Sequence, residues 1–205
     1  MHPSHHARNN PDKVAYRMAR SNKAITYGEL DARSNQGAQL FRALGLGAGA
    51  HIALLMENRL EFMEICWAAQ RSGLYYTAIS SYLTRDEIAY IVGDCGARVV
   101  ITSAKYCDVL AGLVRDAPEG SAQRFYTVDE PRPGFESWSA AIAAQPATPI
   151  ADQTAGHDML YSSGTTGRPK GIKREVEGQP IDQPHPLLML LCAHMCGQRD
   201  QYVSS

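Results

Sequence analysis

Short apolar runs alternate with amphipathic segments along most of this sequence, and the amphipathic segments begin at polar capping signals. Apolar residues are continuous in the runs, whereas in the segments between them they recur at every third or fourth position. This alternation is typical of a parallel sheet whose strands are joined by helical crossovers. The sequence therefore predicts an α/β fold, a parallel sheet flanked by helices, with the carboxyl ends of the strands at one edge, where ligands bind in such sheets. The expected strands are 51–56, 74–79, 99–101 and 125–128.

Polar residues and glycines mark where the helices are expected to begin and end. Residues 26–29 and 84–87 have the capping-box pattern, in which a threonine hydroxyl and a glutamate carboxylate each accept a hydrogen bond from a free backbone amide. Residues 58–61 carry a similar signal. The three helices are expected to end at Gly45, Gly73 and Gly96, respectively. The other expected elements are a helix around 109–114, a hairpin from 14–18 and 24–26, and a linker at 145–156.

The composition is that of an ordinary folded protein. Of the 205 residues, 44% are hydrophobic and 20% are charged, which excludes disorder, collagen and coiled coil as descriptions of the whole chain. The 20 lysines and arginines are balanced by 21 aspartates and glutamates, for a net charge of -1. Such a chain has no overall electrostatic reason to bind nucleic acid or an anionic membrane, so we expect neither as a partner.

The cysteines and apolar segments predict a cytoplasmic protein. The 5 cysteines, an odd number, are scattered through apolar segments, which is typical of reduced, buried thiols. The first residues lack the apolar core of a signal peptide. The longest apolar run, 187–196, is about half of the roughly 20 residues that a membrane-spanning helix needs, so no transmembrane segment is expected.

Two groups of residues resemble metal ligands in type but not in spacing. Cys192, His194 and Cys196 lack a second, distant ligand pair and lie in an apolar run, for which a buried segment is the simpler interpretation. His2 and the two histidines that follow it lie at a terminus, where disorder is the usual state. The sequence therefore predicts no metal-binding residues.

The segment with the most specific chemistry is 161–171, YSSGTTGRPKG, which begins in a short expected strand at 159–161. Its glycines permit positive φ and close backbone approach, its hydroxyls donate hydrogen bonds, and successive amides in such a loop can form an anion nest. These features suit a polyphosphate, although a flexible surface loop has a similar composition. The glycine spacing differs from that of a Walker A loop. The residues are Ser162, Ser163, Gly164, Thr165, Thr166, Gly167, Arg168, Pro169, Lys170 and Gly171.

The same string resembles the phosphate-loop signature of the adenylate-forming superfamily. This superfamily comprises acyl-CoA synthetases, the adenylation domains of peptide synthetases and firefly-type luciferases. The match is contiguous over 161–171, with Ser162 where threonine is commoner. Blocks upstream are similar to successive N-terminal blocks of the family in order and spacing, so the resemblance covers residues 10 to 172. These blocks are 11–16, 25–31, 44–54, 58–62 and 68–102.

The resemblance implies a two-step reaction. A carboxylate attacks the α-phosphate of ATP to give an acyl-adenylate and pyrophosphate, and a thiol, usually that of coenzyme A, then takes the acyl group as a thioester. ATP, Mg²⁺ and coenzyme A are thus the implied cofactors and co-substrates of an acid–thiol ligase. The loop would orient the leaving pyrophosphate by electrostatic preorganisation. The implied phosphate-binding residues are Ser162, Ser163, Gly164, Thr165, Thr166, Gly167 and Lys170.

The resemblance also implies that the sequence is the N-terminal part of such an enzyme. In the family, the phosphate loop lies in the first half of a protein well over twice this length. Later blocks supply a magnesium-binding glutamate, a ribose-binding aspartate and a C-terminal domain with a catalytic lysine, and 172–205 resemble none of them. We expect 1–172 to be the N-terminal part of the adenylate-forming domain and 173–205 a divergent or truncated tail. No catalytic residue is identifiable, so this chain alone is expected to be inactive.

The acyl substrate and two alternative functions stay open. Where the family usually has a Ser/Thr–His pair after the loop, this sequence reads Ile172-Lys173-Arg174, which is similar to fatty-acid-type synthetases. The expected substrate is therefore a small-molecule carboxylate of fatty-acid type. One alternative is an adenylation domain that loads a carrier protein, and the other is a non-catalytic fragment that binds a nucleotide or associates with other chains. A parallel sheet cut midway has an unpaired edge, so poor solubility or oligomerisation is also expected.

Overall fold

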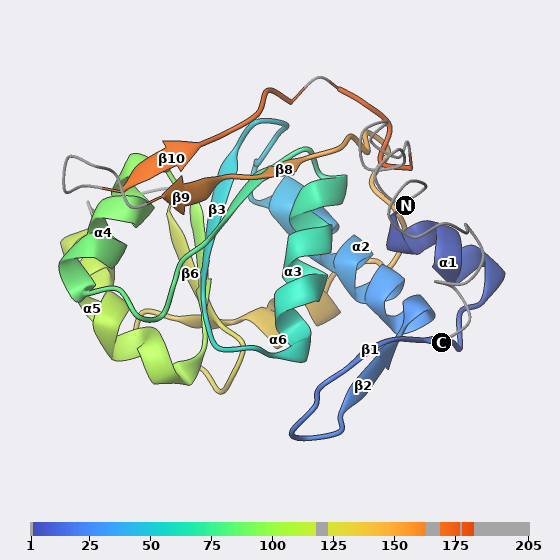
Figure 1. The fold of residues 1–205 in the computed structure, drawn as a ribbon, viewed down its shortest axis with the longest axis horizontal. Coiled ribbons are helices and arrows are strands. Elements are labelled where there is room, and N and C mark those ends of the chain that lie inside the picture. The colour runs from blue at the N-terminus through green and yellow to red at the C-terminus, as the bar shows by residue number, and fades with distance from the viewer. Residues whose placement is uncertain (1, 118–122, 163–168, 177, 183–205) are drawn as a thin grey trace.

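The computed structural model describes residues 2–117, 123–162, 169–176 and 178–182. At its centre is a six-stranded parallel sheet with the strand order β7-β6-β5-β3-β4-β8, flanked by helices on both faces (Figure 1). The predicted fold class is therefore confirmed. The strands are β3 (His51–Leu55), β4 (Tyr75–Ala78), β5 (Val99–Thr102), β6 (Arg124–Thr127), β7 (Glu136–Ser137) and β8 (His157–Asp158).

Each face of the sheet carries its own apolar core, because alternate residues of a strand point to opposite faces. Ile52 and Leu54 of the central strand β3 pack on one face with the helices α2 (Tyr27–Ala43), α3 (Leu60–Arg71) and α6 (Trp138–Ala143). Ala53 and Leu55 pack on the other face with α4 (Arg85–Asp94) and α5 (Cys107–Asp116), which follows the short 3-10 helix η1 (Ala104–Tyr106). Burial on both faces explains why β3 is an uninterrupted apolar run.

Two of the three predicted helix starts are capped as expected. In α2, the Thr26 amide donates to Glu29 Oε2 at 2.8 Å and the Glu29 amide donates to Thr26 Oγ1 at 3.2 Å. Thr84 and Glu87 make the same reciprocal pair at the start of α4. Gly45, Gly73 and Gly96 have φ values of 72°, 68° and 64°, the left-handed conformation that ends a helix.

The third predicted start is wrong in its cap. Helix α3 begins at Leu60 after Arg59, and no side chain caps it, so the signal at Asn58 does not operate. The physical reason is an ion pair: Arg59 Nη1 lies 2.8 Å from Asp129 Oδ1, at the end of a distant strand. Arg59 pairs also with Glu57 and Glu61 on either side of it. These pairs hold the Arg59 side chain at the carboxyl edge of the sheet.

Replacing Thr26 by alanine should lower the free energy of unfolding by about 1 kcal/mol, because the hydroxyl that caps α2 is lost. Hydrogen bonds from the amide and the hydroxyl of Thr26 hold the pKa of Glu29 below its ordinary value. A lowered folded pKa contributes stability above the unfolded pKa, and that stability is lost as the pH falls through the folded pKa. Urea unfolding at neutral and acidic pH measures both effects, with Thr84→Ala as the matched variant. An unchanged midpoint at neutral pH would contradict the cap.

The N-terminal histidines do not lie in a disordered terminus, contrary to the prediction. Helix α1 (Pro3–Asn9) packs on α2, and the His2 side chain, 2% exposed, caps it by accepting a hydrogen bond from the Ser4 amide at 3.2 Å. Pro3 is preorganised for the first helical position, which favours a helix here. The His2 ring also contacts the Trp67 ring edge-on, at 5.0 Å between centroids. Burial and the nearby Arg71 charge lower the pKa of His2 to about 3, so its ring is neutral near pH 7.

The hairpin of β1 (Val14–Arg17) and β2 (Ala24–Thr26) forms as predicted, and the expected linker is a packed strap. Residues 145–156 contain no helix or strand of their own, but one stripe of α2 binds them along their length. Gln36 donates to the Gln145 carbonyl at 3.1 Å, and Gln39 donates to the Thr148 carbonyl at 2.9 Å. Arg42 pairs with Asp152 at 3.0 Å. Tertiary contacts, rather than local propensity, therefore fix this segment.

Three of the five cysteines lie in the described part of the chain, and all three are free and buried, as predicted. Burial raises the pKa of the Cys66 thiol to about 12, so this thiol is protonated and unreactive. Cys192, His194 and Cys196, with the apolar run 187–196, lie outside the described residues. Among the described helices, none is long and apolar enough to cross a membrane.

Candidate functional site

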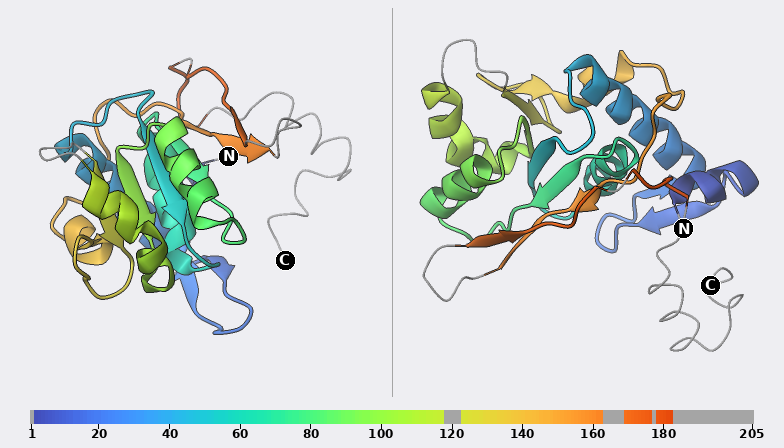
Figure 2. Two further views of the ribbon diagram at one scale, coloured as in Figure 1. Left: turned by 90° about the vertical axis from the view of Figure 1, so that its left-hand side faces the viewer. Right: turned by 90° about the horizontal axis from the view of Figure 1, so that it is seen from above.

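The predicted phosphate loop connects two strands that leave the main sheet. After β8, the chain forms β9 (Leu160–Ser162), which pairs antiparallel with β10 (Lys170–Ile172) in a separate two-stranded ribbon. We call this pair of strands the ribbon. Figure 1 shows it beside α4, and the right-hand view in Figure 2 shows the same neighbourhood from above. The predicted site residues Ser163, Gly164, Thr165, Thr166 and Gly167 lie outside the described residues.

Ser162 and Lys170 stand opposite each other where the loop begins and ends. They are register partners across the ribbon, and both are exposed. Side chains of directly opposed residues emerge on the same face of an antiparallel pair. The structure therefore brings one hydroxyl and one ammonium group of the predicted set together on the outer face of the ribbon. Both groups donate hydrogen bonds, and together they match the acceptor oxygens of a phosphate.

The inner face of the ribbon explains why residue 171 is glycine. Gly171 is the register partner of Tyr161, and a Cβ at Gly171 would lie 3.0 Å from Tyr161 Cζ and 2.3 Å from Met159 Cε. Gly171 is not among the described glycines with positive φ. Close approach of the Tyr161 ring, and not an unusual backbone conformation, therefore requires a glycine here.

Two tyrosines attach the ribbon and the segment after it to the body of the protein. The Tyr161 hydroxyl donates to Asp94 Oδ2 at 2.5 Å, at the C-terminal end of α4. The Tyr75 hydroxyl, on β4, donates to the carbonyl of Arg174. The Tyr75 ring has the Lys173 ammonium 5.2 Å from its centroid and stacks on His51 at 4.7 Å. Sequence reasoning found neither anchor, because it assigned residues 173–205 to a tail.

The carboxyl edge of the sheet, where a ligand was expected, carries a charged network that is internally satisfied. Ser103, after β5, donates to Glu57 Oε2 at 2.6 Å, after β3. Asp129, after β6, accepts from the Ala104 amide at 2.7 Å and pairs with Arg59. Burial opposes ionisation of Asp129, but these hydrogen bonds and the Arg59 charge hold its pKa below the ordinary range. Among the described residues, no group of three or more potential ligands could hold a metal ion.

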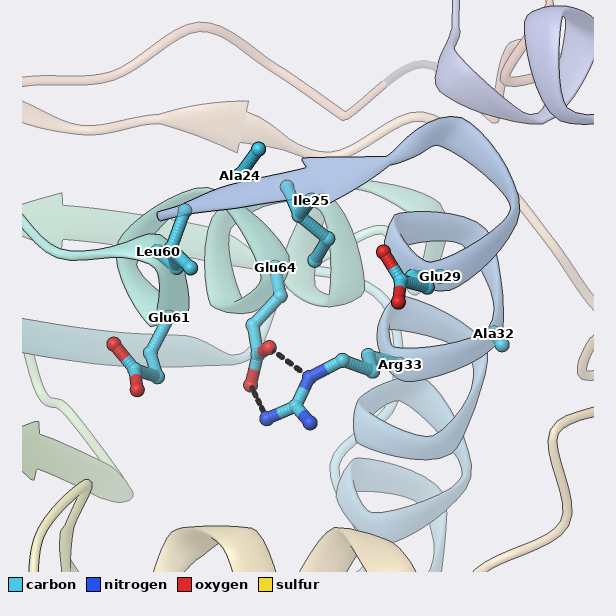
Figure 3. Close-up of a pocket in the computed structure, with 8 residues that line it drawn as sticks. All are labelled: Ala24, Ile25, Glu29, Ala32, Arg33, Leu60, Glu61 and Glu64. Carbon is cyan, nitrogen blue, oxygen red and sulfur yellow. Dashed lines mark hydrogen bonds and ion pairs between the residues drawn. The ribbon is translucent and has the colours of Figure 1, made fainter. Parts of the chain in front are cut away.

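A hollow of about 460 Å³ lies between β2, α2 and α3 (Figure 3). Arg33 of α2 and Glu64 of α3 form a two-bond ion pair in its wall, and Trp138 Nε1 donates to Glu64 Oε1 at 2.8 Å. The Glu64 side chain is 1% exposed, and burial raises its pKa despite these partners. The acid and the base are thus engaged with each other, which is a packing role. The sequence carried no signal for this pair beyond the helical positions of its members.

Comparison with known families gives one match over most of the chain. The family described as AMP-binding enzyme matches residues 4–179, which include the ribbon and the segment held by Tyr75.

Curated relatives are coenzyme A ligases. The chain is 31% identical over 166 residues to the long-chain-fatty-acid–CoA ligase FadD13 of Mycobacterium tuberculosis, covering 79% of this chain and 32% of that protein. It is 33% identical over 156 residues to the 4-hydroxybenzoate–CoA/benzoate–CoA ligase of Rhodopseudomonas palustris, covering 73% of this chain and 28% of that protein. The chain therefore spans about a third of the length of the relatives it matches.

A solved structure described as Mycobacterium tuberculosis fatty acyl CoA synthetase is similar in fold. Its TM-score is 0.70 at 26% identity, over 85% of this chain and 34% of that chain. The fold of the described residues is thus that of the N-terminal region of adenylate-forming enzymes.

Proposed function

Because this chain belongs to the AMP-binding enzyme family, we propose that it is the N-terminal part of an ATP-dependent acyl-CoA ligase. The observation that carries the proposal is the pairing of Ser162 with Lys170 at the two ends of the loop whose sequence resembles the family's phosphate loop. The names of the relatives, which are coenzyme A ligases for fatty and aromatic acids, support it.

In this proposal the chain binds and orients the phosphates of ATP. The Ser162 hydroxyl and the Lys170 ammonium, with Ser163, Gly164, Thr165, Thr166 and Gly167, hold the β- and γ-phosphates so that pyrophosphate leaves in a fixed direction. Donor groups alone fit this role, since phosphate oxygens are acceptors. Mg²⁺, when bound, neutralises the phosphates, and it is commonly held by one or two carboxylates and the phosphates themselves. Coenzyme A is the proposed acyl acceptor.

We propose a carboxylate of fatty-acid type as the acyl substrate and the cytoplasm as the compartment. Lys173 and Arg174 after the loop and the similarity to FadD13 support the substrate class. The free, buried thiols of Cys66, Cys95 and Cys107 support a reducing compartment. The proposed division of the chain stays at residue 172, although the family match continues to 179.

Replacing Lys170 by alanine should weaken ATP binding by this chain about tenfold, because a charge-assisted contact to phosphate is removed. Isothermal titration with MgATP and with pyrophosphate measures the loss. Lys105→Ala is the matched control, since Lys105 lies on η1, away from the ribbon, with its ammonium 5.1 Å from the Tyr106 ring centroid. Equal affinity of wild type and Lys170→Ala would contradict the assignment of the site.

Residues 1–205 alone should show no carboxylate-dependent exchange between ATP and pyrophosphate. The chain spans 32% of the length of FadD13, and adenylate formation by the family uses groups that later parts of such proteins supply. The assay measures incorporation of labelled pyrophosphate into ATP with and without a fatty acid. ATP binding without exchange fits the proposed N-terminal part, whereas robust exchange would contradict the expected inactivity. Absence of ATP binding would favour the alternative of a non-catalytic interaction fragment.

A further inference from the structure

Tyr161 holds the inner face of the ribbon through three contacts. Its hydroxyl donates to Asp94 Oδ2 at 2.5 Å, its ring covers Gly171 on the opposite strand, and it packs against the core shared by α4 and α5. Successive residues of a strand point to opposite faces, so the Ser162 hydroxyl points outward when Tyr161 points inward. The orientation of Tyr161 therefore sets the direction in which Ser162 emerges.

Asp94 occupies a position that is unfavourable for the helix that carries it. It is the last residue of α4, and this helix has no basic residue in its last turn. A carboxylate at a helix C-terminus is repelled by the partial negative charge there. The Asp94 carboxylate instead accepts from the Tyr161 hydroxyl and, at 3.3 Å, from the Tyr90 hydroxyl. A residue that conflicts with its own helix while it bonds a distant strand is typical of a functional constraint.

The other end of the ribbon has an anchor of its own. The Tyr75 hydroxyl donates to the carbonyl of Arg174, and the Lys173 ammonium lies over the Tyr75 ring. Tyr161 directly precedes Ser162, and Arg174 lies four residues after Lys170. The ribbon is therefore fixed to α4 on one side of the loop and to β4 on the other. Of the two anchors, the one made by Tyr161 lies next to a phosphate-binding side chain.

We propose that Tyr161, held by Asp94, is a positioning residue for phosphate binding, which it controls by fixing the orientation of Ser162 and of the strand pair that presents Lys170. The proposal rests on the proposed function of the ribbon and deepens it. Neither Tyr161 nor Asp94 touches the nucleotide, and both act through the residues beside them. Preorganised donors bind an anion without the loss of freedom that a loose ribbon would suffer.

Tyr161→Phe and Asp94→Ala test the proposal, with Tyr82→Phe as the matched control because Tyr82 is 97% exposed. Each test variant should raise the dissociation constant for MgATP and for pyrophosphate roughly three- to tenfold, the loss expected for one partly exposed hydrogen bond. The double variant should be no worse than either single one, because both remove the same bond. The control should bind as the wild type does.

The unfolding midpoint separates positioning from general stability. Asp94→Ala removes an unfavourable helix-end charge and adds a strong helix former, so its urea midpoint should equal or exceed that of the wild type. Hydrogen exchange of the amides in 160–162 and 170–172 should nevertheless become faster in both test variants. Weaker binding accompanied by a lower midpoint in Asp94→Ala would mean a merely structural role and would overturn the proposal.

Exchange rates also keep the two proposals distinguishable. Unchanged nucleotide affinity in both test variants, or unchanged exchange in the ribbon, overturns the positioning role of Tyr161. No MgATP binding by the wild-type chain overturns the proposed function instead. In that case, the exchange rates still decide whether the bond between Tyr161 and Asp94 fixes the ribbon.

Discussion

Replacing Asp31 by alanine should lower the free energy of unfolding by about 3–5 kcal/mol, the range observed when one partner of a buried ion pair is removed. The Arg71 side chain is 1% exposed, and its Nη2 lies 2.5 Å from Asp31 Oδ1 across the contact of α2 with α3. Burial already lowers the pKa of Arg71, and Asp31 opposes that effect. Without Asp31, the guanidinium is left in the interior without a counter-charge. Urea unfolding monitored by circular dichroism measures the loss.

A double-mutant cycle shows whether the lost stability comes from the stranded charge. Asp31→Ala with Arg71→Met removes both charges and should be more stable than Asp31→Ala alone, because no unpaired ion then remains. The matched control is Asp116→Ala, since Asp116 pairs with Arg115 at the surface, where both side chains are more than two-thirds exposed. This variant should change stability by less than about 1 kcal/mol. Equal losses in Asp31→Ala and Asp116→Ala would refute the argument.

Replacing Gly156 by alanine should lower the free energy of unfolding by about 3 kcal/mol, at the upper end of the usual cost of overpacking. An added Cβ would lie 2.2 Å from the Leu74 carbonyl oxygen, 2.7 Å from the Leu74 nitrogen and 3.0 Å from the Ala69 carbonyl oxygen. These atoms are all backbone, so no side-chain rotation relieves the contact. Gly156 directly precedes β8, which pairs with β4 and leads into the ribbon. The substitution should therefore also weaken nucleotide binding.

Gly112→Ala is the matched control for this substitution. Gly112 lies inside α5, and a Cβ there would meet only the Arg115 side chain, at 4.0 Å. Alanine has the higher helix propensity, so this variant should gain about 0.5–1 kcal/mol. Thermal unfolding of the two variants should thus move in opposite directions. A wild-type midpoint in Gly156→Ala would show that β8 shifts to accommodate the methyl group.

Much of the fold could be predicted because its signals are local. The capping residues of α2 lie three positions apart, and the glycine that ends each predicted helix follows within a turn of the last helical residue. The continuous burial of β3 is written in its composition. The loop string 161–171 likewise identified the family without any tertiary information. Interactions of this range are specified by neighbours in the chain, so sequence patterns report them directly.

The sequence by itself determined the alternation of strands and helices, their caps and the resemblance that names the chemistry. Only the tertiary structure decided which polar groups are buried together. Asp31 and Arg71 are 40 residues apart, Tyr161 and Asp94 are 67 apart, and Gln36 bonds a strap 109 residues away. The same distance in sequence separates the predicted cap at Asn58 from its competitor, since Arg59 is drawn to Asp129, 70 residues away. Such pairs form because burial makes an unpaired charge costly, and which residues meet there depends on how the sheet and helices pack.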